Sequence, residues 1–230
     1  MPERVTLKIA DVRPEGGRAK TLYFATDMRI LPGQFLMVAD YGGGEKPISV
    51  SEAENGRVGI TVKESGPFSR RLCGKKKGDL MSLRGPYGRP FTASAGESIL
   101  VGGGCGIAPL HLLATALLAS GGRVTVVSGA RTPGEILLGD RFRGLPLDYF
   151  ETAEDSGERL TAVDLADRIM KTKKFDFAYA AGPELMLAAL RPRLDGMEYQ
   201  FSLERYMKCG VGICGSCACD PTGIRFCVEG

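Results

Sequence analysis

The cysteines of this chain are concentrated near its C-terminus. Of the 7 cysteines, five lie between Cys209 and Cys227, and only Cys73 and Cys105 stand apart. The N-terminal residues lack the apolar core of a signal peptide, so we expect a cytoplasmic protein. Because reducing thiol pools in the cytoplasm keep cysteine pairs open, the clustered cysteines favour a metal site over disulfides.

The spacing of these cysteines predicts the kind of site. Three of them follow the C-x4-C-x2-C pattern of plant-type [2Fe–2S] sites, in which the fourth thiolate comes from later in the chain. Glycines between them allow the sharp turns and close backbone approach that a loop around a cluster needs. A zinc ribbon would need a second C-x2-C pair about 15–20 residues away, and the chain has only one such pair. The predicted ligands are Cys209, Cys214, Cys217 and Cys227, while Cys219 is predicted to be a small buried side chain beside the cluster.

Composition excludes several classes of function. The 30 Lys and Arg residues against 27 Asp and Glu give a net charge of only +3, which does not favour a nucleic-acid binder. No apolar run approaches the ~18 residues of a membrane-spanning helix. The 1 histidine, His111, falls within a helical pattern and is predicted to be structural, so we assign no catalytic side chain.

Hydrophobic patterning divides the rest of the chain into two parts. As far as about Phe91, apolar residues alternate with polar ones in short stretches such as Val5–Ile9 and Val58–Val62, separated by glycine and proline. This pattern predicts an antiparallel barrel or sandwich. After it, Ser98–Val101 is an apolar run typical of a buried parallel strand.

Further strands and helices alternate after this run. Arg123–Val127 and Phe175–Ala181 are predicted strands, and a helix is expected from Thr161 with Asp164 placed for a weak capping box. Strands that alternate with helices predict a parallel α/β sheet. We therefore expect a β-barrel domain at 1–94, an α/β nucleotide-binding domain at 95–202 and a cluster-binding segment at 203–230.

Two glycine-rich turns follow strands of the predicted sheet. The first leads from Gly102 into a helix expected to begin near Pro109, and the second follows the strand that ends near Ala181. Exposed amides at a helix start can bind a pyrophosphate, and ligands of open α/β sheets bind at the carboxyl ends of strands. The expected nucleotide-binding residues are Gly103, Gly104, Gly106, Gly182 and Pro183.

Several short motifs occur in a recognisable order before the cysteine cluster. They are Pro32–Phe35, Lys46–Val50, Gly66–Ser69, Gly85–Gly88, Gly102–Pro109 and Ala181–Pro183. In this order, and over essentially its whole length, the sequence resembles the ferredoxin–NADP⁺ reductase superfamily. More narrowly, it is similar to the electron-transfer subunits of the NAD-linked (class 1B) dihydroorotate dehydrogenases.

The resemblance implies that the barrel binds FAD and that the α/β domain binds NAD. Lys46 replaces the arginine usual in the flavin motif, which keeps the charge but loses the bidentate fork. Cys105 stands where the family often has threonine or another small residue, and we expect it to be packed. The flavin-binding residues that the resemblance implies are Lys46, Pro47, Ile48 and Ser49 in one motif and Gly66, Pro67, Phe68 and Ser69 in the other.

The resemblance also implies a function and a partner. Electrons would leave dihydroorotate in an FMN-containing catalytic subunit, cross the cluster and FAD of this chain, and reduce NAD⁺ in a step of pyrimidine biosynthesis. The complex would be a heterotetramer. Tyr206, Met207 and Val211 flank the cluster and are candidates for the partner surface, although core packing explains them nearly as well.

Two alternatives stay open at this point. One is a flavin and iron–sulfur subunit of an NAD(P)H-dependent ferredoxin reductase or sulfhydrogenase with the same fold. The other is a non-catalytic redox-sensing subunit, for which Lys46 and Cys105 are the only hints. The choice between NAD and NADP also stays open, because Arg131 after the second α/β strand can meet either a 2′-phosphate or solvent.

Overall fold

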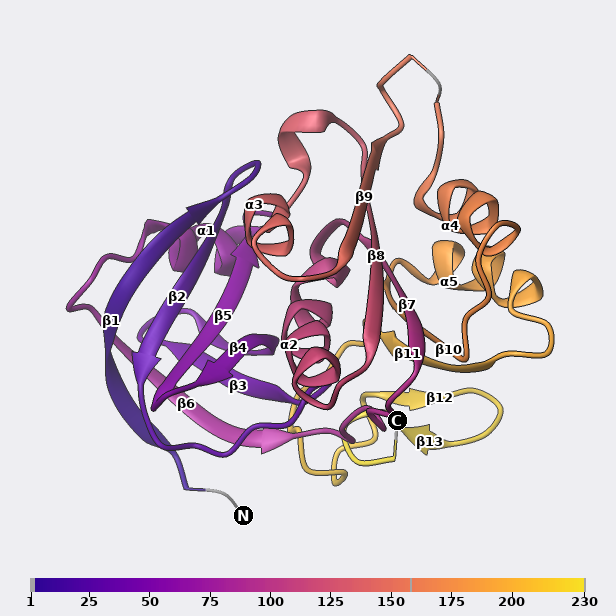
Figure 1. The fold of residues 1–230 in the computed structure, drawn as a ribbon. Helices are drawn as coiled ribbons and strands as arrows, with labels where there is room; N and C mark the ends of the chain where they lie inside the picture. Colours follow the sequence, from indigo (N-terminus) through magenta and orange to yellow (C-terminus); the bar gives the residue numbers. More distant parts are fainter. Residues whose placement is uncertain (1–2, 158, 230) are drawn as a thin grey trace. The chain divides into compact units, whose positions relative to one another are not determined.

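The chain forms two compact units (Figure 1). In the computed structural model, which describes residues 3–157 and 159–229, one unit contains the residues up to Pro90 together with those from Arg205 onward. The other unit is Phe91–Glu204. One unit contains a closed antiparallel barrel and the other a parallel sheet, which confirms the predicted fold class. The finer division at 1–94, 95–202 and 203–230 stays a prediction about function.

The barrel closes in the order β1-β2-β5-β4-β3-β6. Neighbouring strands are antiparallel throughout, as the alternating sequence pattern predicts. Helix α1 (Pro67–Gly74) packs on β5 and buries Leu72 there, so β5 is buried at successive positions rather than at alternate ones. The strands are β1 (Val5–Glu15), β2 (Ala19–Ala25), β3 (Phe35–Asp40), β4 (Gly44–Glu54), β5 (Arg57–Lys63) and β6 (Leu80–Tyr87).

The second unit is a parallel sheet in the order β11-β10-β7-β8-β9. Its strands are β7 (Glu97–Gly103), β8 (Arg123–Ala130), β9 (Asp148–Ala153), β10 (Phe177–Gly182) and β11 (Glu198–Leu203). Its helices are α2 (Ile107–Ala119), α3 (Gly139–Arg143), α4 (Ala162–Met170) and α5 (Glu184–Leu190), with short 3-10 turns at Gly104–Gly106, Pro133–Glu135 and Arg191–Arg193. No helix in the described part of the chain is long and apolar enough to cross a membrane.

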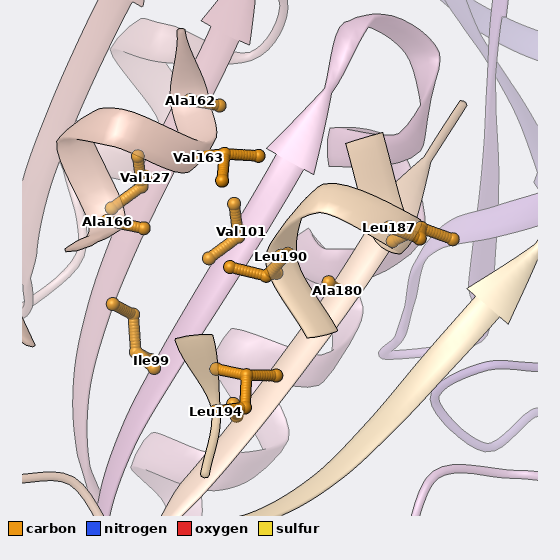
Figure 2. Packing of buried hydrophobic residues seen from close by; sticks show 11 residues of the cluster. Ile99, Val101, Val127, Ala162, Val163, Ala166, Ala180, Leu187, Leu190 and Leu194 are labelled. Carbon is orange, nitrogen blue, oxygen red and sulfur yellow. The ribbon is translucent and has the colours of Figure 1, made fainter. Parts of the chain in front are cut away.

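The core of the parallel sheet is aliphatic. Figure 2 shows side chains of α4 and α5 pointing toward the central strands, with Val163 and Leu190 facing Val101. These residues are almost fully buried, and burial of apolar surface is the main source of folding free energy. The sheet therefore has a hydrophobic core of its own.

Some details of this unit differ from the sequence predictions. The capping box between Thr161 and Asp164 is confirmed at the start of α4. Helix α2 begins at Ile107, earlier than the expected start near Pro109, because a 3-10 turn leads directly into it. Strands β9 and β11 were not predicted. They are the edges of the sheet and alternate less clearly, since many of their side chains are partly exposed.

The residues from Arg205 onward contain little regular structure. Only two short strands, β12 (Ala218–Cys219) and β13 (Ile224–Arg225), occur in the described part of this segment, and they pair with each other. We call residues 205–229 the cysteine segment. The segment is held on the barrel by apolar contacts in which Cys217 and Cys227 pack with Phe35, Met37 and Tyr87.

Candidate functional site

The structure places the four predicted cluster ligands in two hydrogen-bonded pairs. The amide of Cys214 donates to the Sγ of Cys209 at 3.5 Å, and the amide of Cys227 donates to the Sγ of Cys217 at 3.5 Å. The amide of Gly212 donates to the Sγ of Cys227 at 3.2 Å and so joins the two halves of the segment. Amides aimed at sulfur stabilise the thiolate form that binds metal.

The two pairs lie in different electrostatic surroundings. Hydrogen bonds from the hydroxyl and amide of Ser216 lower the pKa of the exposed Cys214 thiol to about 6. Burial raises the pKa of Cys227 to about 11. For Cys209, burial raises the pKa, but amide hydrogen bonds, first among them that of Val211, outweigh it and leave the pKa below its usual value. Binding of a metal to Cys227 must therefore remove a proton from a thiol whose pKa is raised, whereas Cys214 gives up its proton more easily.

This arrangement fits two irons better than one ion. Within residues 3–157 and 159–229, no three histidine, cysteine or acidic side chains form a group that could hold a single metal ion. A [2Fe–2S] cluster needs no such group, because each of its two irons takes two protein ligands. The pairs Cys209–Cys214 and Cys217–Cys227 would offer two thiolates to each iron.

Two other cysteines differ from their predicted surroundings. Cys219 is partly exposed rather than buried, because it lies on β12, and its thiol donates to the carbonyl of Asp220 at 3.6 Å. Cys105 is exposed rather than packed, because the 3-10 turn before α2 points it outward from the sheet. His111 is buried against Phe142, with ring centroids 5.2 Å apart, which agrees with a structural role.

Strand β4 presents the predicted flavin residues on a partly open strip. Lys46, Pro47, Ile48 and Ser49 are each partly buried, whereas most of the neighbouring strand β3 is fully buried. The Lys46 ammonium lies 4.9 Å from the centroid of the Tyr206 ring, in the cysteine segment. This strip of β4 is therefore partly accessible, and the cysteine segment lies beside Lys46.

The start of α1 supplies the second predicted flavin motif. Gly66 caps the helix in an extended conformation, and Pro67 and Phe68 begin it. The Ser69 hydroxyl accepts the amides of Ser65 and Gly66 at 2.9 and 3.0 Å, so the chain itself uses this side chain. A Cβ on Gly66 would meet no atom within 4 Å, so the space beside the helix start is open. Backbone amides of the first turn, which carry the positive end of the helix dipole, are what this loop offers a phosphate.

The two glycine turns of the α/β unit lie together at the carboxyl ends of neighbouring strands β7 and β10. A Cβ on Gly106 would overlap the backbone carbonyl of Ala181, so glycine is required for α2 to start this close to β10. Gly104 has a φ of +54°, in the left-handed region that favours glycine. The predicted residues gathered here are Gly103, Gly104, Gly106, Gly182 and Pro183.

One polar group was missed by the sequence analysis. Arg84 on β6 holds Glu45 on β4 through two hydrogen bonds and also donates to the backbone carbonyl of Cys209. The two charged residues are far apart in sequence, and strand β3 lies between their strands in the barrel. Only the order of the strands in the barrel brings Arg84 and Glu45 together. The alternation of apolar and polar residues in the sequence does not predict that order.

The comparisons with known proteins agree with this geometry. Residues 204–230 match the family model described as the iron–sulfur cluster binding domain of dihydroorotate dehydrogenase B. A probable dihydroorotate dehydrogenase B (NAD⁺) electron transfer subunit from Methanothermobacter thermautotrophicus is 40% identical over 230 residues. That alignment covers 97% of this chain and 86% of the relative.

Solved structures show the same fold. An NADH-dependent reduced ferredoxin–NADP oxidoreductase, solved in a study of flavin-based electron bifurcation, superposes with a TM-score of 0.87 at 28% identity and covers 100% of this chain and 88% of its own. Phthalate dioxygenase reductase superposes with a TM-score of 0.74 at 22% identity and covers 87% of this chain and 68% of its own. At 22% identity, the likeness to phthalate dioxygenase reductase shows the fold alone.

Proposed function

This chain belongs to the family of electron transfer subunits of dihydroorotate dehydrogenase B, and we propose that it passes electrons to NAD⁺. The electrons come from a partner subunit, which oxidises dihydroorotate. The observation that carries the proposal is the match to those subunits over 97% of the chain. The paired cysteines on the barrel are consistent with it.

The chain takes FAD, a [2Fe–2S] cluster and NAD as its cofactors. When bound, nicotinamide exchanges a hydride, the cluster exchanges single electrons, and flavin exchanges either. No side chain has to act as an acid or base in this chemistry. The work of the protein is to bind the three groups and to set their electrostatic surroundings.

We assign the cluster to the two cysteine pairs and the flavin to the open strip of β4. Met37 of β3 pairs with Pro47 of β4 and also packs against Cys217 and Cys227. Adjacent strands of a sheet are only about 4.8 Å apart. One residue of β3 therefore contacts both the strand assigned to flavin and two of the cysteines assigned to the cluster, which suits electron transfer between them.

We assign the nucleotide to the glycine turns at the ends of β7 and β10. Gly106 packs closely on the backbone of β10, so the start of α2 lies beside the end of that strand. The first amides of α2 and the helix dipole attract a pyrophosphate. We assign Gly182 and Pro183, at the carboxyl end of β10, to the same site, because ligands of open α/β sheets bind at this edge.

The exposed part of the cysteine segment is the surface that we assign to the partner subunit. Cys214 is exposed, and around it the segment exposes apolar side chains, of which Ile213 is 73% and Tyr206 58% exposed. Met207 and Val211 instead pack on the barrel, so they belong to the internal contact rather than to this surface. A catalytic subunit that contains FMN, assembled with this chain as a heterotetramer, would cover such a patch.

The test measures two activities on one cofactor-replete complex, made by co-expressing this chain with the dihydroorotate dehydrogenase catalytic subunit. We expect oxidation of NADH by a dye with or without the partner, and dihydroorotate-dependent reduction of NAD⁺ only with it. Dye activity without dihydroorotate activity in the assembled complex would overturn the proposal. It would favour a ferredoxin reductase, which the likeness to the ferredoxin–NADP oxidoreductase keeps as the second candidate.

A further inference from the structure

Arg84 makes an unusually complete set of contacts for a barrel side chain. Its Nε donates to Glu45 Oε1 at 2.9 Å and its Nη2 to Glu45 Oε2 at 2.6 Å, which is the bidentate arrangement that guanidinium and carboxylate groups favour. The Arg84 side chain is only 15% exposed, and that of Glu45 is 18% exposed. A pair with this geometry and little solvent contact is held far more firmly than a surface ion pair.

The remaining nitrogen of Arg84 reaches the cysteine segment. Nη1 donates to the backbone carbonyl of Cys209 at 2.7 Å and to the hydroxyl of Tyr87 at 3.0 Å. The next residue, Gly210, has a φ of +74°, and a Cβ there would lie 3.0 Å from Met37. The backbone at Cys209 is therefore held by a hydrogen bond from Arg84, and the next residue, Gly210, is in close contact with Met37 of the barrel.

The hydrogen bond from Arg84 fixes Cys209, the first cysteine of the Cys209–Cys214 pair. The amides of Val211 and Cys214 both donate to the Sγ of Cys209, so the direction of that thiol depends on where the backbone of Cys209 is fixed. Glu45, which anchors Arg84, immediately precedes Lys46 and the flavin strip on β4. One side chain thus ties the Cys209–Cys214 pair to the strand that we assign to flavin.

We propose that Arg84 is a positioning residue for electron transfer, which fixes the Cys209–Cys214 loop on the barrel and supplies positive charge that favours the reduced cluster. The inference rests on the proposed function, because it needs a cluster at these cysteines. Guanidinium is suited to this task, since its planar fork can hold a carboxylate and a carbonyl at once.

The charges around Arg84 support the proposal that this residue favours the reduced cluster. Glu45 is shared between Arg84 and Arg4, whose Nη2 lies 2.8 Å from Glu45 Oε1, so the three side chains together carry a net charge of +1. Burial raises the pKa of Glu45, but its hydrogen bonds and attraction to both arginines outweigh this and keep it ionised. Reduction of a cluster adds a negative charge, and nearby positive charge stabilises the product.

The experiment compares Arg84→Gln with Arg4→Gln in the complex loaded with FAD and iron. Each variant removes one positive charge from Glu45, but only the first releases Cys209. The readouts are iron and flavin content, the EPR spectrum of the reduced cluster and its midpoint potential. For Arg84→Gln we expect a broader EPR signal and a lower potential, by about a tenfold change in the reduction equilibrium, which is about 59 mV for one electron. For Arg4→Gln we expect an unaltered EPR line shape and a smaller shift.

The conservative variant Arg84→Lys keeps the charge but not the fork. We expect it to restore most of the potential while the EPR signal stays broad, and it decides the matter if Arg84→Gln fails to fold. Equal EPR spectra and potentials in Arg84→Gln and Arg4→Gln, or an Arg84→Lys spectrum identical to that of the unmodified chain, would overturn the inference. Absence of a cluster signal from the unmodified chain is a separate result, which overturns the proposed function and this inference with it.

Discussion

The cysteine segment and the parallel sheet are stabilised in opposite ways. The sheet packs α4 and α5 on its central strands through almost fully buried aliphatic side chains (Figure 2). In the cysteine segment the buried side chains packed against the barrel include two of the predicted ligands, Cys217 and Cys227. The comparison teaches that one region carries its own core, whereas the other depends on a bound cluster and on the barrel beneath it.

Length explains the difference. A segment this short cannot bury enough apolar surface to fold alone, and chains below ~40 residues generally need a metal, disulfides or a partner. Its described residues form only the short pair β12 and β13. Metal binding energy then becomes folding energy for this segment, while the sheet does not need it.

The largest effect is expected from replacing a buried ligand. Cys217→Ser should remove most of the iron and sulfide and unfold the cysteine segment, because the remaining thiols cannot complete two iron sites. Iron and sulfide analysis together with hydrogen exchange of the segment and of β7 would measure it. The parallel sheet should keep its protection.

A matched control for this change is Cys105→Ser, which alters an exposed cysteine of the other unit. It should leave iron content and exchange of the segment unchanged. If Cys217→Ser retained full iron, or if β7 lost protection together with the segment, the contrast between the two regions would be wrong.

The next largest effect should come from the glycine turn of the α/β unit. The Cβ in Gly106→Ala would overlap the carbonyl of Ala181, and no side-chain rotation can relieve a clash with backbone. Overpacking of this kind costs about 1–3 kcal/mol. We expect the free energy of unfolding to fall by that amount and KM for NADH to rise, because the start of α2 has to shift away from β10. The EPR spectrum of the cluster should not change.

Gly134→Ala is the control for this prediction, because a Cβ there would meet no atom within 4 Å. It should leave KM for NADH unaltered. An unchanged KM in Gly106→Ala would show that the turn does not bind the nucleotide.

A smaller effect on the cofactor sites, although a larger one on stability, is expected from the aliphatic core. Leu190→Ala removes a fully buried side chain of α5 and should lower the free energy of unfolding of the sheet unit by about 2–5 kcal/mol. Leu185→Ala on the same helix alters a side chain that is 86% exposed, and it should change stability by less than about 0.5 kcal/mol. Urea unfolding, detected by hydrogen exchange, would distinguish the Leu190→Ala variant from the Leu185→Ala variant. Loss of iron in Leu190→Ala without loss of sheet stability would break the comparison.

The sequence predicted those features that depend on local spacing. The run at Ser98–Val101 lies in strand β7 as predicted, and the cysteines of the predicted ligand pattern lie in two hydrogen-bonded pairs; both patterns belong to single stretches of chain. The edge strands β9 and β11 escaped prediction because their side chains are partly exposed and lack a continuous apolar run. The contact between Arg84 and Glu45 escaped it because it reaches across β3 and depends on the strand order of the barrel.

The smallest effect is expected at Cys219, which lies on β12 inside the cysteine segment but outside both ligand pairs. Its thiol donates to the carbonyl of Asp220, and Arg205 approaches its sulfur at 3.9 Å. Serine keeps a donor in this partly exposed place, so Cys219→Ser should preserve iron content and EPR spectrum and change stability by less than about 0.5 kcal/mol. Iron analysis of the Cys219→Ser and Cys217→Ser variants side by side checks this prediction. If both variants lost iron alike, Cys219 would be a ligand, and the segment would fold around a different set of thiolates than the two pairs that its amides favour.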